Sequence, residues 1–271
     1  MFFPVSSTSH LALMQNWLLG RGEELPSPDS AEMILFDLVV HVGTLISIAV
    51  VFRNSLGGYL TNTLRGAKEL VTGDQSQIGK LYVKLTMLGL LSVLVTGMIG
   101  FPLKELFESV FAQPYIMSFT LIITGVLLWW TDILPDRKIG LRQIGIFIAI
   151  VIGIGQGLAL LPGLSRSGLT IAFALFAGLQ RRWAAEYSFF IAFPTILGAT
   201  LLQAIEVITA TEPMTLSLTV LFVGFLVAAI IGIIALKLVI TLLYQAKFRF
   251  FSYYVWALAV VVAISSWHGY L

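Results

Sequence analysis

Six stretches of this chain are long and apolar enough to cross a lipid bilayer as α-helices. A membrane-spanning helix needs roughly 20 mostly apolar residues. The stretches that meet this requirement are residues 33–52, 84–101, 115–134, 186–206, 216–241 and 248–268. With 58% hydrophobic and 11% charged residues, the chain carries more apolar surface than one water-soluble core of 271 residues could bury. The sequence therefore predicts an all-α, multi-pass integral membrane protein.

Charge and residue usage exclude several other classes of function. The net charge is only +2 and the basic residues are scattered between apolar runs, so nucleic-acid binding is not expected. The absence of cysteine excludes disulfides, thiol catalysis and thiolate metal sites. The first residues, MFFPVSSTSHLAL, do not place a basic region before an apolar core, so they are not a signal peptide.

Two further apolar segments are short and interrupted. Residues 145–161 are apolar but Gly-rich, Pro162 and Gly163 then break the run, and a second apolar piece covers only residues 169–178. The chain opens with a similar break at Pro4, followed by a short apolar piece at residues 11–19. Broken segments of this kind are typical of re-entrant hairpins, whose turns survive at membrane depth only where protein or a polar cavity surrounds them.

The two breaks also indicate an internal repeat. The segment PVSSTSH at residues 4–10 aligns with PGLSRSG at residues 162–168, and one proline and two serines match. Three spanning helices follow each break, and an odd number of spans makes the two halves inverted. We expect a single membrane domain over residues 1–271, with one repeat at about 1–135, the other at about 142–268, and the first hairpin incomplete.

The distribution of positive charge gives an independent test of this topology, because Lys and Arg collect on the cytoplasmic side. If both ends of the 142–180 hairpin face the cytoplasm, every Lys and Arg lies on that side except Arg21, Lys104 and Arg166. The longest polar connection, residues 53–84, is expected to form a loop with a short surface helix.

Arg166 is the basic residue that this topology leaves inside the membrane. An unpaired charge near the bilayer centre costs about 2.5 kcal/mol or more of insertion free energy. We therefore expect the Arg166 side chain to be solvated or to bind a ligand. Three hydroxyls, at Ser165, Ser167 and Thr170, flank it, and Gly163 and Gly168 leave their backbone N–H groups open to a ligand. A helix starting near Ser167 would point its positive end at the same place. This combination predicts a phosphate or pyrophosphate site. The alternative is a turn solvated by headgroups, in which the serines act only as caps.

The first break supplies Ser6, Ser7, Thr8, Ser9 and His10. A lone histidine beside an apolar run is usually a packed or interfacial residue. An inverted repeat, however, would bring the two breaks face to face, where His10 could act as general base, general acid or nucleophile, with Ser7 as the competing nucleophile.

Among the remaining intramembrane polar residues, Asp37 and His41 share one helix face, and the simpler interpretation is a hydrogen-bonded pair that orients the bundle.

Several segments resemble the BacA/UppP family of bacterial undecaprenyl-diphosphate phosphatases. They are FPVSSTSHL (3–11), FDLVVHVGTL (36–45), GQGLALLPGLSRSGLTI (155–171) and AAEYSFFIAFPTILGA (184–199), and the resemblance covers essentially the whole chain. It implies an inverted repeat with two re-entrant hairpins and six spans in the bacterial inner membrane. It also implies hydrolysis of undecaprenyl diphosphate to undecaprenyl phosphate and inorganic phosphate. This reaction recycles the carrier for peptidoglycan synthesis, cell-wall biogenesis and cell shape, and high dosage of such proteins confers bacitracin resistance.

Carried onto this sequence, the resemblance places the diphosphate-gripping arginine at Arg166 and the active-site serine and histidine at Ser7 and His10. The expected catalytic residues are therefore His10, Ser7 and Arg166, and the expected substrate-binding residues are Ser6, Ser165, Ser167, Gly168 and Thr170. The expected partners are the polyprenyl diphosphate substrate, membrane lipids and a second copy in a homodimer, without nucleic acid.

One departure from the family pattern concerns the divalent cation, Mg²⁺ or Ca²⁺, on which the resemblance implies that activity depends. The family carries an acidic E-x-x-x-E or Q-x-x-x-E motif ahead of FLPVSSTxH, and here Met1 stands in the place of the second glutamate. The metal ligands are therefore unknown. One hypothesis is a start assigned about 20 residues too late, the length of one helix plus a short terminus. The other is a natural truncation with little or no activity.

Two functions of other classes stay open. Inverted repeats with broken helices are also typical of secondary transporters, so a transporter or lipid-phosphate flippase is the main alternative. A structural membrane subunit is the second, although it gives Arg166 no role.

Overall fold

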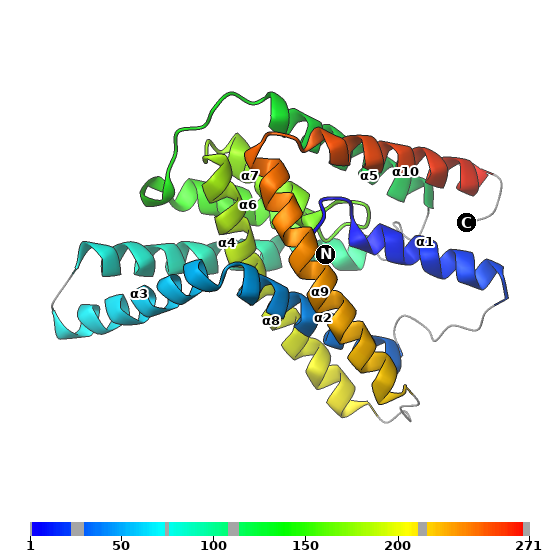
Figure 1. The fold of residues 1–271 in the computed structure, drawn as a ribbon, viewed down its shortest axis with the longest axis horizontal. Coiled ribbons are helices and arrows are strands. Elements are labelled where there is room, and N and C mark those ends of the chain that lie inside the picture. Colours follow the sequence, from blue (N-terminus) through cyan, green and yellow to red (C-terminus); the bar gives the residue numbers. More distant parts are fainter. Residues whose placement is uncertain (1, 23–29, 74–75, 108–113, 211–215, 268–271) are drawn as a thin grey trace.

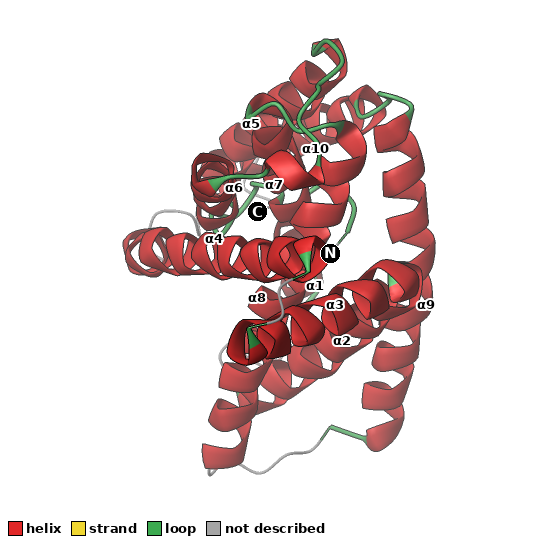
Figure 2. Cartoon of the chain, turned by 90° about the vertical axis from the view of Figure 1, so that its left-hand side faces the viewer, coloured by secondary structure: helices red, strands yellow, loops and turns green. Residues whose placement is uncertain are grey.

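The computed structural model describes residues 2–22, 30–73, 76–107, 114–210 and 216–267, which fold into ten α-helices and one short 3₁₀ helix (Figure 1). In chain order they are α1 (Ser7–Gly20), α2 (Ala31–Val51), α3 (Arg53–Thr72), α4 (Gln77–Phe107), α5 (Pro114–Ile133), η1 (Leu141–Gln143), α6 (Ile146–Leu158), α7 (Arg166–Phe176), α8 (Arg181–Thr209), α9 (Leu218–Tyr244) and α10 (Arg249–Trp267). Within these ranges the chain contains no strand, and the helices are joined by loops (Figure 2).

Six helices are long and apolar enough to span a bilayer, and they correspond one to one to the six predicted runs. They are α2, α4 as far as Pro102, α5 from Tyr115, α8, α9 and α10. The prediction of an all-helical, multi-pass membrane protein is therefore confirmed. Two helices begin earlier than the apolar runs predicted, because α4 starts at Gln77 and α8 at Arg181.

The expectation of a loop with a short helix between residues 53 and 84 was wrong. This region forms α3, which is 20 residues long, and the first turns of α4. The two helices project from the bundle as a pair (Figure 1), and Gly66 and Gly79 let their backbones touch. Some polar residues of this region are exposed, such as Arg65 and Lys68, whereas Thr63 and Glu69 of α3 form hydrogen bonds with Thr86 and Ser76.

Small residues bring the spanning helices together. Gly43 of α2 lies so close to α9 that a Cβ atom there would stand 2.8 Å from the carbonyl oxygen of Phe225. One turn further, the Ser47 hydroxyl donates to the carbonyl of Ala229 at 2.9 Å. Gly153 of α6 approaches the backbone of Ser92 in α4 in the same way. Close backbone approach and interhelical hydrogen bonds are the usual means of helix association in lipid, where apolar surfaces gain little from burying each other.

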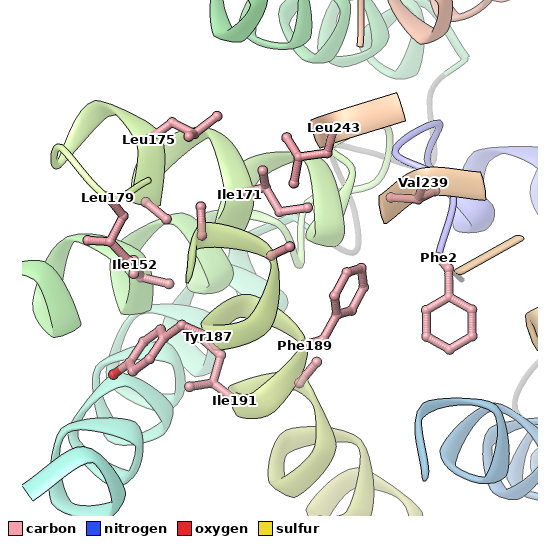
Figure 3. Packing of buried hydrophobic residues seen from close by; sticks show 14 of the residues in the cluster. Phe2, Ile152, Ile171, Leu175, Leu179, Tyr187, Phe189, Ile191, Val239 and Leu243 are labelled. Atoms are coloured by element: carbon pink, nitrogen blue, oxygen red, sulfur yellow. The ribbon is translucent and has the colours of Figure 1, made fainter. Parts of the chain in front are cut away.

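The central core surrounds α7, an 11-residue helix that is buried along most of its length. Figure 3 shows Ile171 and Leu175 of α7 among residues of α6, α8 and α9. α7 contacts α5, α6 and α8, so the helix lies inside the bundle. The preceding helix, α6, has 13 residues, and both are too short to span a bilayer of ordinary thickness alone.

Candidate active site

The turn between α6 and α7 is anchored by two threonines of α5. Thr120 Oγ1 donates to the carbonyl oxygen of Pro162 at 2.7 Å, and Thr124 Oγ1 donates to that of Gly163 at 2.9 Å. Gly163 has φ of 91°, and a Cβ atom there would collide with the Thr120 hydroxyl. The turn therefore requires glycine both for its backbone conformation and for the close approach of α5.

Ser165 caps the N-terminus of α7, since its Oγ accepts a hydrogen bond from the backbone N–H of Gly168 at 3.3 Å. Ser167 Oγ donates to the carbonyl of Phe2 at 2.9 Å, and Thr170 Oγ1 donates to the carbonyl of Arg166 at 2.9 Å. The three hydroxyls expected to bind substrate thus lie together at the helix start. In this conformation the hydroxyl hydrogens of Ser167 and Thr170 point at backbone carbonyls, so donation to a ligand requires them to rotate.

Arg166 is the first residue of α7, and its guanidinium forms no hydrogen bond or ion pair with the residues that the structure describes. It lines a narrow pocket whose free volume of about 10 Å³ would hold about one water molecule. The other lining residues are Phe2, Ser167, Thr170, Ser188, Phe189, Ala192 and Ile196, none of which is acidic. A cation in such a pocket, with no acidic side chain against it among the described residues, favours an anionic ligand.

The N-terminal segment lies against this helix start. Besides accepting from Ser167, Phe2 packs its ring against Phe189 of α8. A Cβ atom at Gly168 would stand 3.3 Å from that of Pro4. The first break therefore contacts the second near the centre of the molecule (Figures 1 and 2).

His10 lies on α1 and faces α10 instead of the Arg166 pocket. Its Nδ1 is 2.8 Å from the carbonyl oxygen of Ser6, and its Nε2 is 2.7 Å from the hydroxyl of Tyr254, whose ring stacks on the imidazole. Because a carbonyl only accepts, Nδ1 carries the proton and Nε2 accepts from Tyr254. This arrangement leaves Nε2 as the basic nitrogen, with its lone pair occupied by a phenol.

Ser6 and Ser7, the first two serines of the break, differ in environment. Ser6 is buried, has φ of 60°, and places its Oγ 2.9 Å from Ser9 Oγ. Ser7, the first residue of α1, has an exposed side chain. Neither Ser7 nor His10 is among the residues that line the Arg166 pocket. The structure brings the two backbone breaks together without bringing these two side chains to the guanidinium.

Asp37 and His41 form a polar link between two spanning helices. His41 Nδ1 lies 2.8 Å from the carbonyl and 3.2 Å from the carboxylate of Asp37, and Gln203 Nε2 of α8 donates to that carboxylate at 2.8 Å. This geometry supports the interpretation that the pair orients α2 against α8.

Comparison with known proteins decides the family. Residues 1–261 match the family described as "Bacitracin resistance protein BacA". The chain belongs to the BacA family. A protein of Halorhodospira halophila is 56% identical over 264 residues, covering 97% of this chain and 92% of the relative. One of Alkalilimnicola ehrlichii is 59% identical over 263 residues, covering 97% and 91%. A more distant one, from Methanobrevibacter smithii, is 32% identical over 268 residues, covering 98% and 92%. All three are named undecaprenyl-diphosphatase.

Sequence reasoning missed four residues around the site of this BacA-family chain. Thr120 and Thr124 carry a usable signal, because hydroxyls four apart in a spanning helix share one face. Ser188 and Tyr254 carry none, because single polar residues in apolar spans are common and their neighbours become known only from the fold.

The metal ligands that the resemblance implies are not identified among the described residues. Among them, no three His, Asp or Glu side chains lie close enough together to hold a metal ion. The polar groups around the Arg166 pocket are hydroxyls and a guanidinium, and an unpaired guanidinium repels a cation.

Proposed function

We propose that this chain hydrolyses undecaprenyl diphosphate to undecaprenyl phosphate and inorganic phosphate, and so recycles the lipid carrier for peptidoglycan synthesis. Relatives more than half identical over nearly the whole chain carry the corresponding name. The single observation that carries the proposal is Arg166, a cation with no partner among the described residues, at the start of a buried helix. Bacitracin resistance at high dosage follows from membership of the family.

Electrostatic stabilisation is the main catalytic effect under this proposal. The Arg166 guanidinium and the positive end of α7 neutralise charge on the diphosphate while the phosphoanhydride bond breaks. Ser165, Ser167 and Thr170, together with Gly168 and the hydroxyl of Ser6, are the proposed further contacts with the headgroup. The backbone N–H of Gly168 was expected to be open but donates to Ser165 Oγ, so it can contact the headgroup only after that hydrogen bond breaks.

His10 and Ser7 are the proposed groups for nucleophilic attack and proton transfer. Ser6 holds the proton on His10 Nδ1, so Nε2 can accept the proton of an attacking water or of Ser7. Tyr254 must release Nε2 before it can act as a base. The reaction therefore requires a movement of α1 relative to α10 that carries His10 and Ser7 towards the diphosphate.

The isoprenoid chain needs an apolar space connected to the headgroup site. Two cavities of about 190 and 320 Å³ lie between α3, α4 and α8, and they share Leu56, Tyr59 and Phe190. Phe189 lines both the smaller cavity and the Arg166 pocket. We propose that part of the tail occupies these cavities, which are entered sideways from the membrane past Leu60 and Leu90.

The finer architecture belongs to the same proposal. α6 and α7 are proposed to form one re-entrant hairpin, and α1 the second arm of another, within inverted repeats at about 1–135 and 142–268. The short lengths of these helices and the three spans after each break support this arrangement.

Three further properties remain predictions: location in the bacterial inner membrane, a homodimer, and dependence on Mg²⁺ or Ca²⁺. Comparing turnover with and without a chelator tests the dependence on a divalent cation.

Release of inorganic phosphate from undecaprenyl diphosphate by the purified protein in detergent tests the proposed function. We expect phosphate release with the wild-type chain and its loss with Arg166→Ala. A transporter or flippase would instead move labelled lipid between the leaflets of a vesicle and release no phosphate. Lipid movement without phosphate release would therefore refute the hydrolase and support the transporter or flippase.

A further inference from the structure

One buried serine of α8 has no partner for its hydroxyl. Ser188 is 2% exposed, and its Oγ makes no hydrogen bond with any residue that the structure describes. Other buried hydroxyls in the spans donate to the carbonyl four residues earlier, as Ser92 and Thr200 do. A buried polar group left unsatisfied costs about 1–3 kcal/mol, so the side chain of Ser188 calls for a ligand or another explanation.

The position of Ser188 supplies that explanation. It lines the same pocket as Arg166, Ser167 and Thr170, but from a different helix. The remaining walls are the apolar side chains of Phe2, Phe189, Ala192 and Ile196. A neutral O–H donor, a guanidinium and the N-terminal end of α7 therefore converge on one water-sized space with dry surroundings, where hydrogen bonds to an anion are strong.

We propose that Ser188 binds the substrate's headgroup by donating its hydroxyl to a non-bridging phosphate oxygen of the group that Arg166 contacts. The proposal rests on the proposed function and adds a residue from α8 to a site that the sequence motifs place only on the two breaks. A free volume of about 10 Å³ suits one oxygen atom of a phosphate whose phosphorus stays at the mouth of the pocket. Ser188 contributes to binding and not to proton transfer.

The experiment uses Ser188→Ala in the purified full chain, with Ser252→Ala as the matched control. Ser252 lies in α10, is 0% exposed, and also has an unpartnered Oγ, but it does not line the pocket. Loss of one hydrogen bond to a charged group should raise the KM for undecaprenyl diphosphate roughly tenfold, with kcat within about twofold. Ser252→Ala should keep the wild-type KM.

An unchanged KM in Ser188→Ala, or an equal rise in both variants, would overturn the proposal. The thermal midpoint of Ser188→Ala should equal or exceed that of the wild type, since the change removes an unsatisfied buried hydroxyl. A KM effect in a stable variant is then not a folding defect.

Binding of inorganic pyrophosphate, measured by calorimetry, separates this inference from the proposed function. If the wild-type chain binds pyrophosphate but releases no phosphate from the lipid, the hydrolase proposal fails, and pyrophosphate binding by the two serine variants still decides the Ser188 contact. Weaker pyrophosphate binding by Ser188→Ala than by Ser252→Ala would support the anion contact. Equal binding by the two variants, or no binding by the wild type, would refute it.

Discussion

The two breaks of the chain begin from similar sequences and end as different kinds of structure. The second break, residues 162–166, is tied to α5 by Thr120 and Thr124 and leads into a buried helix. The first break leads into α1, whose Leu11 and Trp17 are exposed. The second therefore presents its side chains from a fixed frame, whereas the first carries them on a helix with less packing around it.

The ionisable residue at each break, Arg166 or His10, fits this difference. Arginine remains protonated at any ordinary pH, so Arg166 needs an anion or water wherever it lies. Histidine can be neutral, and His10 satisfies both ring nitrogens with Ser6 and Tyr254. The comparison teaches that the second break is built to bind charge, while the first holds a group that can accept a proton once it is released.

Removing the cation at the second break should have the largest effect. We expect Arg166→Ala to lower kcat/KM about a thousandfold, because loss of one preorganised charge contact to a transition state costs roughly two to three orders of magnitude. Arg65→Ala is the control, since Arg65 is 73% exposed and pairs with Glu69 on α3. Phosphate release is the measurement. A loss of less than tenfold in Arg166→Ala would remove the charge-binding role from the second break.

At the first break, His10→Ala should lower kcat about a hundredfold, the lower range for removal of a general acid or base. Tyr254→Phe tests the same contact from the other side, because it frees Nε2 while keeping the stacked ring. We expect Tyr254→Phe to retain activity within a few fold. If His10→Ala and Tyr254→Phe lose activity equally, the role of His10 is its contact with Tyr254 of α10 and not proton transfer. The two breaks would then differ only in how tightly they are packed.

The sequence predicted much of the fold for a simple physical reason. A spanning helix must be apolar for about 20 residues, and such runs cannot be mistaken for loops. The sequence did not predict the helix α3. Its leucines, Leu56, Leu60 and Leu64, recur every fourth residue among polar and glycine residues and give only an amphipathic pattern.

The site residues, too, could be predicted only where their sequence setting is unusual. Arg166 could be singled out because a charge in an apolar setting is rare. Ser188 could not be, because a serine that bonds its own helix and a serine that faces a pocket look identical until the neighbouring helix is known. The contact between His10 and Tyr254, which are 244 positions apart, likewise depends on the fold.

The rigidity of the second break can be tested at Gly163. Gly163→Ala should destabilise the protein by about 3 kcal/mol, because it combines a left-handed conformation with overlap onto Thr120. Gly73→Ala is the matched control: Gly73 has φ of 79° but open space around it, so the cost should be about 1 kcal/mol. Thermal unfolding in detergent gives the comparison. Equal shifts in the two variants would mean that the anchorage to α5 adds no rigidity.

The smallest expected effect concerns the tail, which the cavities place on the α8 side of the second break. Gly89 of α4 lines the larger cavity, and a side chain there would extend towards Phe190 and Ile191, whereas Gly97 on the same helix faces open space. Gly89→Leu should therefore raise the KM for undecaprenyl diphosphate about tenfold, as expected for losing burial of one or two isoprenoid carbons, and Gly97→Leu should not. Farnesyl diphosphate presents the same headgroup to Arg166 with a much shorter chain, so its KM should be affected less by Gly89→Leu. A rise that is equal for both substrates would place the disturbance at the headgroup, and a rise that is equal for both glycines would move the tail out of the α3–α4–α8 cavities.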